Sequence, residues 1–298
     1  MGASVHLLRP AVAIVSSMLL GLLAGPLAAQ RTERGRMPWG GVERTYTVRL
    51  PRIADSARTL PVVIALHGRG GTGERMAHWS GLDVKADAEG FLLVAPDGTG
   101  IPRGWYTGFA PGGAIDDVGF IGALIDTLAT RYRVDRGRVY VAGHSNGGAL
   151  THRIASDLSS RVAAAAVVAG AVGVRSGDGR TMTIEPPRAP VPMLIIHGYA
   201  DGVVPYDGLP LTRGVSRSIP APEGARFWAR ANECAALEPQ RDTIASGRAL
   251  RDRWERRCRA PVVFLTLRDG DHGWPRGDSG AAIDATDVIW EFFRQHRR

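Results

Sequence analysis

Along residues 42–298, hydrophobic and polar positions follow two alternating patterns. Short runs rich in valine, isoleucine, leucine and alanine are typical of strands, and longer stretches with apolar residues three or four positions apart are typical of amphipathic helices. Strands are predicted at 44–50, 62–66, 91–95, 139–142, 164–168, 193–196 and 261–267. Helices are predicted at 74–89, 116–132, 146–158, 222–235 and 281–295.

The regular exchange of strand and helix along the chain indicates the fold class. A helix between two strands usually crosses the sheet and makes the strands parallel, so that helices cover both faces. The segment 44–50 alternates with period two, which predicts an edge strand. A chain of 298 residues is long enough for one large domain. We therefore expect a single α/β domain over residues 42–298, with a mostly parallel central sheet covered by helices on both faces.

Residues 1–30 differ in composition from the rest of the chain. Arg9 carries their only full charge, the run 11–24 is almost wholly apolar, and small residues follow it. This layout is typical of a secretory signal peptide. The alternative is a membrane anchor, because the apolar run is close to the shortest that spans a bilayer. We predict cleavage between residues 28 and 31, a flexible lead-in over 31–41, and a secreted or periplasmic protein that leaves the membrane.

The chain is basic, with a net charge of +8 and an isoelectric point near 10.2. Such a charge can indicate nucleic acid as a partner. However, Lys85 is the only lysine among the 37 basic residues, and the arginines are spread along the chain. The one cluster, at 251–259, is interrupted by Asp252 and Glu255. We therefore expect a solvated, arginine-rich surface and no nucleic-acid partner.

The chain has two cysteines, Cys234 and Cys258. In an exported protein an even number of cysteines predicts disulfide bonds. A single bond between them would close a loop of about 25 residues and contribute about 3 kcal/mol on chain-entropy grounds. Two unrelated buried thiols are the alternative. The sequence has no Cys–His cluster and no HExxH motif, so neither a metal nor another cofactor is predicted.

The pentapeptide Gly143-His144-Ser145-Asn146-Gly147 follows a predicted strand and opens a predicted helix. In this context a GxSxG pattern is typical of a nucleophile elbow, a tight turn that exposes a reactive serine. Strand and helix come so close together at the turn that both glycine positions must lack a side chain. The N–H after the serine points toward a developing oxyanion at the start of the helix. The pattern predicts Ser145 as a nucleophile and the backbone N–H of Asn146 as an oxyanion donor.

A serine nucleophile needs a general base, and the base needs a carboxylate that orients it. In proteins with this elbow the chain order is serine, acid, histidine, and the acid follows a later parallel strand. Asp201 comes shortly after the predicted strand 193–196 and is the predicted acid, with Asp207 as an alternative farther from the strand end. His272 follows the last predicted strand with glycines on both sides. It is therefore the predicted base.

The other histidines and one pair of acidic residues suit structural roles better. His197 precedes the predicted acid at a strand end, His144 is expected to point away from its neighbour, and His67 is expected to brace the loop that follows it. Asp116 and Asp117 open a predicted helix. We expect them to cap that helix, because aspartate is favoured at helix N-termini.

The glycine-rich loop 67–71 follows the first buried strand of the predicted sheet. Its glycines allow the backbone to approach a substrate closely. We predict the N–H of Arg69 as the second oxyanion donor, with the N–H of Gly70 as the alternative. The loop lacks the lysine and the following serine or threonine of a P-loop, so a phosphate site is not predicted.

Together these motifs resemble those of the secreted polyhydroxybutyrate depolymerase-like esterases, a family that also includes feruloyl and acetyl-xylan esterases. The resemblance covers roughly residues 43–293. The matching stretches are LPVVIALHGRGG, GFLLVAPDG, DDVGFIGALIDTLATRYRVDRGRVYVAGHSNGGAL, PMLIIHGYADGVVPYDG and GDHGWP. The resemblance implies an α/β-hydrolase fold, with the family's nucleophile, acid and base at Ser145, Asp201 and His272. It also implies a disulfide between Cys234 and Cys258.

The chain departs from the family pattern at two places. Asn146 follows the serine where relatives more often have a small residue, so the floor of the site is expected to differ. The stretch 104–107 resembles an aromatic segment near the family's substrate cleft but lacks its cysteine. Trp105 and Trp274 are therefore candidate substrate-binding residues, with packing in the core as the alternative.

The predicted reaction is hydrolysis of a carboxylic ester through an acyl-enzyme on the serine. The resemblance implies hydroxybutyrate oligomers or related esters as substrates, with feruloyl or acetyl-xylan esters as the alternative. No substrate-binding module or linker is visible, which favours soluble or amorphous substrates. Acyl transfer to a sugar would need an apolar channel that excludes water, and no insertion is visible that would build one. A non-catalytic binding protein is the third hypothesis, and a complete set of catalytic residues argues against it.

Overall fold

The computed structural model describes residues 1–2, 31–51, 59–109, 115–176, 180–208 and 217–298. Nearly all of the predicted signal peptide lies outside these residues. Among the residues described, no helix combines the length and the apolar character that crossing a bilayer requires.

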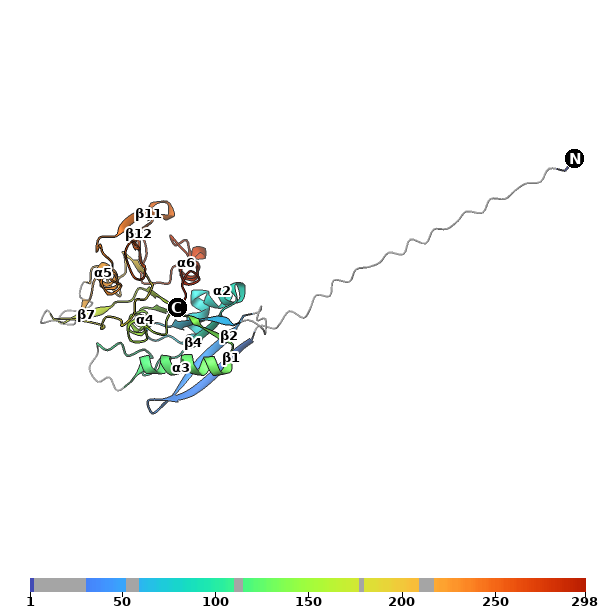
Figure 1. Ribbon diagram of the computed structural model, residues 1–298, viewed down its shortest axis with the longest axis horizontal. Helices are drawn as coiled ribbons and strands as arrows, with labels where there is room; N and C mark the ends of the chain where they lie inside the picture. The colour runs from blue at the N-terminus through green and yellow to red at the C-terminus, as the bar shows by residue number, and fades with distance from the viewer. Residues whose placement is uncertain (3–30, 52–58, 110–114, 177–179, 209–216) are drawn as a thin grey trace.

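One ten-stranded sheet runs through the described part of the chain (Figure 1). Its central strands are parallel and lie in the order β4 (Leu92–Pro96), β3 (Leu60–Leu66), β5 (Val134–His144), β6 (Ala164–Val168), β9 (Met193–Gly198) and β13 (Val262–Leu267). Antiparallel strands extend both edges: β2 (Val42–Leu50) and β1 (Arg31–Trp39) beside β4, and β12 (Ala249–Trp254) and β11 (Gln240–Ile244) beside β13.

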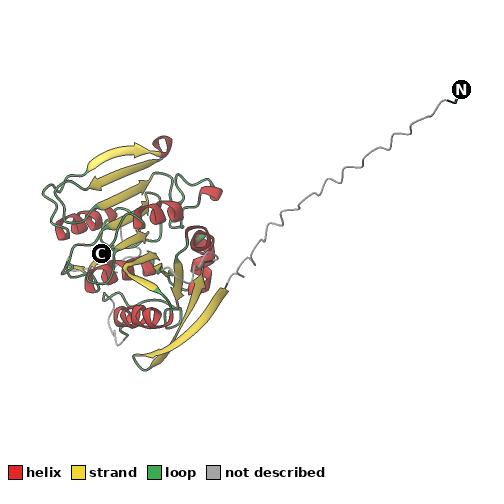
Figure 2. Cartoon of the chain, turned by 45° about the vertical axis from the view of Figure 1, so that its right-hand side comes forward, coloured by secondary structure: helices red, strands yellow, loops and turns green. Residues whose placement is uncertain are grey.

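Helices cover both faces of this sheet (Figure 2). One face packs against α3 (Asp117–Arg131), α4 (Asn146–Asp157) and α5 (Ala221–Ala231). The other packs against α1 (Gly73–Ser80), α2 (Leu82–Glu89) and α6 (Ala285–Phe293). Successive side chains of a strand point to opposite faces, so Ile64 lies in the first core and Val63 in the second. The structure confirms the predicted α/β fold.

Smaller elements lie at the periphery of the main sheet. A three-stranded sheet is formed by β10 (Arg217–Ser218), β7 (Gly173–Arg175) and β8 (Thr181–Thr183). Two short 3₁₀ helices are η1 (Ala245–Gly247), between β11 and β12, and η2 (Gly277–Ser279), between β13 and α6. The predicted disulfide between Cys234 and Cys258 is present and joins the segment after α5 to the turn between β12 and β13.

Residues 31–39, predicted to belong to a flexible lead-in, instead form strand β1. They pair along their whole length with β2, from Arg31 opposite Leu50 to Trp39 opposite Val42. Gly40 and Gly41 between the strands both have positive φ, which suits a two-residue hairpin turn. This strand was not predicted because its composition is polar. It lies at the edge of the sheet, where its side chains are exposed or half-buried. The predicted edge strand at 44–50 is therefore the second strand of the sheet.

The helix predicted at 74–89 is two helices, α1 and α2, separated by Gly81. This glycine has a left-handed backbone with φ of 75°, which ends the first helix. The hairpin of β11 and β12 was not predicted, because its alternating charged residues resemble a loop. Its arginines pair across the strands, Arg241 with Asp252 and Arg251 with Asp242.

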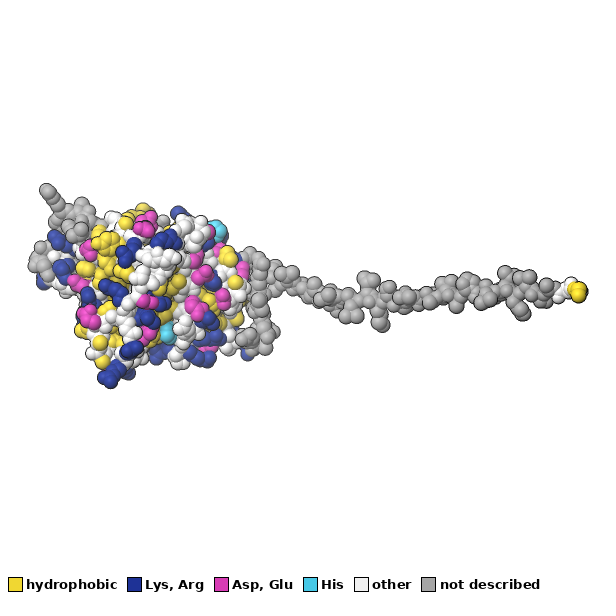
Figure 3. All heavy atoms as spheres, turned by 90° about the horizontal axis from the view of Figure 1, so that it is seen from above, with side chains coloured by type: hydrophobic (Ala, Val, Ile, Leu, Met, Phe, Trp, Pro, Cys, Tyr) yellow, Lys and Arg dark blue, Asp and Glu magenta, His cyan; other side chains and the backbone are white. Residues whose placement is uncertain are grey.

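Basic and acidic side chains are interspersed over the face of the molecule shown in Figure 3. Pairs such as Arg36 with Glu43, at 3.2 Å, join exposed side chains of opposite charge. Such pairs contribute little to stability, since both groups are well solvated. This surface is the solvated, arginine-rich one expected from the sequence.

The two acidic residues at the start of α3 have different roles. Asp116 is the expected N-cap, and its carboxylate accepts a hydrogen bond from the N–H of Gly119. Asp117 is instead fully buried and forms an ion pair of 2.7 Å with the buried Arg44. It also accepts a hydrogen bond from the N–H of Tyr106. Asp117 therefore anchors the backbone at Tyr106 to the start of α3.

Candidate active site

Ser145 lies between the end of β5 and the start of α4. Its backbone angles, φ 55° and ψ −117°, belong to a region that residues other than glycine rarely adopt. A Cβ atom on Gly143 would lie 2.2 Å from the carbonyl oxygen of Gly147, and one on Gly147 would lie 2.4 Å from that of Leu66. Side chains there would collide with backbone, so the two glycines are what allow the turn. The strand, turn and helix of a nucleophile elbow are therefore present.

Three polar side chains from distant parts of the sequence meet at this elbow. Nε2 of His272 lies 2.8 Å from Oγ of Ser145, and Nδ1 of His272 lies 2.8 Å from Oδ2 of Asp201. The three residues follow β5, β13 and β9, parallel strands whose carboxyl ends share one edge of the sheet. Asp207, the alternative acid, is exposed to solvent. The contacts are those of a nucleophile, a base and an orienting carboxylate.

Asp201 is buried, and both of its carboxylate oxygens accept hydrogen bonds. Oδ1 accepts from the backbone N–H groups of Val203 and Val204, each at 2.8 Å. Oδ2 accepts from His272 and lies 3.3 Å from Nε2 of His197. Burial by itself raises the pKa of a carboxyl group, but these hydrogen bonds outweigh it and hold the pKa of Asp201 well below its usual range. The carboxylate is therefore ionised at neutral pH.

His144 makes a contact that sequence reasoning missed. Its Nε2 donates a hydrogen bond of 2.6 Å to the backbone carbonyl of His272. A carbonyl oxygen only accepts, so Nε2 carries the proton. Burial lowers the pKa of His144 to about 4, so the ring is neutral near pH 7. His144 thus fixes the backbone of His272, and because 128 residues separate the two, no local pattern could have revealed the contact.

The loop after β3 presents a backbone donor to the site. The N–H of Gly70 donates to the carbonyl of Arg103 at 2.6 Å and is therefore occupied. Within the described residues, the N–H of Arg69 has no acceptor. The N–H of Asn146 lies in the first turn of α4, where N–H groups have no intrahelical acceptor. Arg69 and Asn146, the predicted oxyanion donors, are thus both available, whereas Gly70 is not.

The side chain of Asn146 points toward the neighbouring loop, away from the cleft. Its Oδ1 accepts from the N–H of Trp105 at 2.7 Å, and its Nδ2 donates to the carbonyl of Trp105 at 3.0 Å. The indole of Trp105 is 6% exposed, and its Nε1 donates to the carbonyl of His67 at 2.8 Å. His67 in turn accepts at Nε2 from the N–H of Gly98. These bonds connect the elbow, the loop 67–71 and the segment 98–105.

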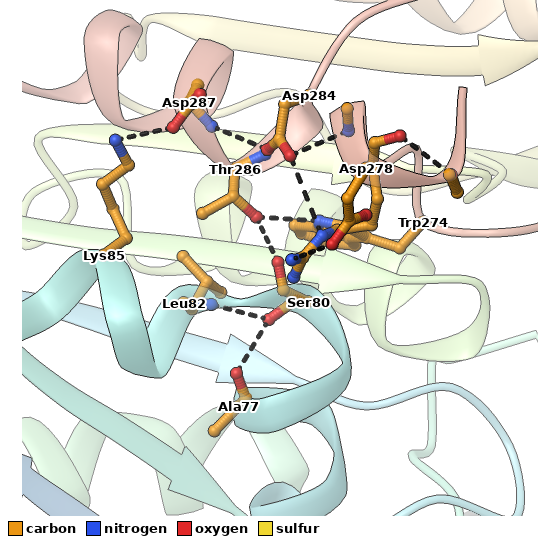
Figure 4. A network of polar contacts seen from close by, with 12 residues as sticks. Ala77, Ser80, Leu82, Lys85, Trp274, Asp278, Asp284, Thr286 and Asp287 are labelled. Carbon is orange, nitrogen blue, oxygen red and sulfur yellow. Dashed lines mark hydrogen bonds and ion pairs between the residues drawn. The ribbon is translucent and has the colours of Figure 1, made fainter. Parts of the chain in front are cut away.

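Trp274 is 4% exposed and belongs to the polar network shown in Figure 4. Its Nε1 donates to Oγ1 of Thr286 at 3.0 Å, and that hydroxyl donates to the carbonyl of Ser80. The network links the start of α6 to the end of α1 and to the segment that carries His272. Trp274 therefore positions backbone beside the site, in the packing role that was the alternative to substrate binding.

A cleft of about 910 Å³ opens in front of Ser145 and His272. Its walls come from the loop after β3, from α1 and the start of α2, and from the segments after β9 and β13. Trp105 and Trp274 are not among the residues that line it, whereas Trp79, 46% exposed, is. Sequence reasoning missed Trp79, although a tryptophan among the polar residues of a predicted helix was an available signal.

No group of three or more histidine, cysteine or acidic side chains is arranged to hold a metal ion in the part of the chain that the structure describes. The cleft has an elbow, a hydrogen-bonded base and two backbone donors, which together allow nucleophilic attack on a carbonyl. A mostly parallel sheet with serine, acid and histidine in this chain order defines the α/β-hydrolase class.

Comparison with known proteins identifies the family within this class. The family described as esterase PHB depolymerase matches residues 44–184. The chain is 32% identical over 250 residues to NocK of Nocardia uniformis subsp. tsuyamanensis, which is named as an esterase, and the alignment covers 76% of this chain and 70% of NocK. Feruloyl esterase C of Emericella nidulans is 29% identical to this chain over 257 residues, and the alignment covers 84% of this chain and 83% of the feruloyl esterase. The chain therefore belongs to the polyhydroxybutyrate depolymerase-like esterase family, as the resemblance implied.

Solved structures share the same fold. The acetyl xylan esterase from Aspergillus awamori superposes with a TM-score of 0.63 at 17% identity, covering 88% of this chain and 99% of that one. A ferulic acid esterase from Anaeromyces mucronatus superposes with a TM-score of 0.55 at 16% identity, covering 90% of each chain. These likenesses confirm the α/β-hydrolase fold, and a fold alone does not determine the substrate.

Proposed function

We propose that this protein hydrolyses carboxylic esters through an acyl-enzyme on Ser145. The supporting observation is the line of contacts from Oγ of Ser145 through His272 to Asp201, at a strained elbow. His272 takes the proton of the attacking hydroxyl, and Asp201 stabilises the imidazolium that forms. The N–H groups of Asn146 and Arg69 donate to the oxyanion. The alcohol leaves with the proton from His272, and water then releases the acid by the same steps.

Hydrolysis is favoured over acyl transfer because the cleft is open to solvent. Among its lining residues, Arg69, Arg75, Trp79 and Val203 are exposed. Water therefore reaches the acyl-enzyme freely, whereas transfer to a second alcohol needs a site that keeps water out.

Soluble hydroxybutyrate oligomers and related esters are the leading substrate class, supported by the family to which the chain belongs. Feruloyl or acetyl-xylan esters are the second candidate, supported by relatives named as feruloyl esterase C. A cleft of about 910 Å³ is large enough for either kind of ester. Hydrolysis of hydroxybutyrate oligomers, methyl ferulate and acetylated xylan, compared by kcat/KM, distinguishes the two.

The test of the mechanism is Ser145→Ala, assayed with p-nitrophenyl butyrate. Loss of the nucleophile is expected to lower kcat by about 10⁴-fold or more. Ser160→Ala is the matched control, since Ser160 is exposed in the turn after α4. A Ser145→Ala protein that keeps activity within tenfold of the native enzyme would show that the serine mechanism is wrong.

We further propose that the protein is exported and that its N-terminal signal peptide is removed by cleavage between residues 28 and 31. The disulfide between Cys234 and Cys258 supports this, because disulfides persist in oxidising compartments. N-terminal sequencing of protein recovered from the periplasm and from the medium tests the proposal. An N-terminus between residues 29 and 31 is expected, and retention of residues 1–30 would contradict it.

A further inference from the structure

The walls of the active-site cleft carry unequal charge. Arg69, Arg75 and Arg276 line the cleft, and the carboxylates among its lining residues are those of Asp83 and Asp278. A charged group that is already paired within the protein binds a charged substrate group only weakly. The unpaired charges of the cleft therefore determine which substrates it can attract.

Both carboxylates of the cleft wall have partners. Asp278 lies 2.9 Å from the guanidinium of Arg276, and Asp83 lies 3.3 Å from the imidazole of His78. Arg276 also lies 3.8 Å from Asp284. Of the wall's charged groups, Asp278 and Arg276 therefore pair with each other, and Asp83 has a histidine as its partner.

Arg69 and Arg75 have no such partner. Both side chains are exposed, and within the described residues neither guanidinium lies within ion-pair distance of a carboxylate. Glu74, the acidic neighbour of Arg75, pairs with Arg34 at 2.9 Å. Two unpaired guanidinium groups therefore line the cleft in front of Ser145.

The backbone that carries these two arginines is well fixed. The N–H of Gly70, next to Arg69, donates to the carbonyl of Arg103. The N–H of Arg75 donates to Oγ1 of Thr72, the N-cap of α1, at 3.2 Å. Trp79 follows Arg75 by four residues and therefore lies on the same side of α1, one turn further on. One wall of the cleft thus combines an exposed aromatic face with two cationic groups.

Resting on the ester hydrolysis proposed above, we propose that this wall selects esters that carry a free carboxylate, such as the acid end of a hydroxy-acid oligomer. A guanidinium presents a planar fork of donors that matches the two oxygens of a carboxylate. The carboxylate is held by Arg69 and Arg75 while the ester carbonyl lies at Ser145. A neutral ester makes the same contacts with the serine but gains nothing from the arginines.

The expected preference is modest and sensitive to salt. An exposed ion pair of this kind is expected to change kcat/KM by about two- to fivefold per arginine. Raising the ionic strength shortens the Debye length from about 10 Å at 0.1 M to about 3 Å at 1 M, which weakens such pairs. The preference for an anionic ester should therefore decline with added salt, a response that a purely structural role for the arginines does not predict.

The experiment compares matched acid and amide substrates. One pair is the hydroxybutyrate dimer and its terminal primary amide, with the carboxylate on the alcohol side of the ester. The other is mono-p-nitrophenyl glutarate and p-nitrophenyl glutaramate, with the carboxylate on the acyl side. The ratio of kcat/KM for acid over amide is measured at low and high salt for the native enzyme, Arg75→Gln and the double variant R69Q/R75Q. Arg256→Gln is the control, since Arg256 is exposed in the turn before β13, at the opposite end of that strand from His272.

The proposal expects a ratio above one in at least one pair, falling about two- to fivefold in Arg75→Gln and further in the double variant. Arg256→Gln should retain the native ratio and its decline with salt. A native ratio of one or less in both pairs at low salt would overturn the proposal, and so would a ratio above one that is equal in the double variant and the control. If none of these esters is hydrolysed by the native enzyme, the proposed esterase function itself has failed.

Discussion

Asp201→Asn replaces one carboxylate oxygen with an amide nitrogen, and the structure determines which one. Oδ1 receives the N–H groups of Val203 and Val204, so the remaining oxygen of asparagine must stay on that side. The amide nitrogen then faces Nδ1 of His272 and Nε2 of His197. Because an amide nitrogen only donates, Nδ1 of His272 has to become an acceptor, and its proton moves to Nε2.

A proton on Nε2 of His272 leaves Ser145 without a base. The expected loss in kcat is about 10⁴-fold, which corresponds to about 5.5 kcal/mol of transition-state stabilisation. The assay is the hydrolysis of p-nitrophenyl butyrate by purified variants at pH 7.5. Circular dichroism and thermal unfolding show whether Asp201→Asn keeps the native fold.

Asp207→Asn is the matched control, because Asp207 is the other acidic residue near the end of β9 and is exposed to solvent. It is expected to keep kcat within about twofold of the native enzyme, since exposed substitutions away from the site have small effects. The reasoning is refuted if Asp201→Asn stays within tenfold of native activity, or if Asp207→Asn loses as much as Asp201→Asn.

Two further predictions concern stability. The pKa of His144 is about 4 in the folded protein, below its ordinary value of 6.5. Between these two pH values the unfolded chain is protonated at His144 and the folded chain is not. The free energy of unfolding is therefore expected to fall by about 3 kcal/mol as the pH drops from 6.5 to 4. Urea unfolding at pH 7.5 and 4.5 measures this loss, which should be smaller by about that amount in His144→Gln than in the native protein. An equal loss in both proteins would contradict the burial of a neutral imidazole. Gly147→Ala places a Cβ atom 2.4 Å from the carbonyl oxygen of Leu66 and should cost at least about 3 kcal/mol of unfolding free energy. Gly224→Ala, whose Cβ atom meets Val172 at an ordinary 3.5 Å within α5, should be neutral or stabilising, and equal effects of the two alanines would contradict the account of the elbow.

Sequence patterns predicted the central sheet because its strands are buried on both faces and therefore continuously apolar. The candidate triad could be predicted for a related reason. Parallel strands bring their carboxyl ends to one edge, so Ser145, Asp201 and His272 were expected to meet although they are far apart in sequence. Edge strands gave no such signal, because β1 and β11 face solvent and are composed mostly of polar residues.

The direction of individual side chains was the other feature that could not be predicted from the sequence. The sequence does not show whether a tryptophan beside a motif faces the cleft or the core. Trp105 and Trp274 both face the core, where their indole N–H groups donate to buried acceptors. Trp79 and Arg75 line the cleft because of the face of α1 on which they lie. The break at Gly81 ends α1, and the continuous helix predicted for 74–89 did not contain it.

The most direct test of the account is to identify the residue that acts as the nucleophile. A fluorophosphonate probe forms a stable adduct with a serine that a base activates, and peptide mass spectrometry then locates it. The account predicts a single adduct on the peptide that contains Ser145, formed much more slowly in Asp201→Asn and absent in Ser145→Ala. An adduct on another residue, or an active enzyme that forms none, would contradict it.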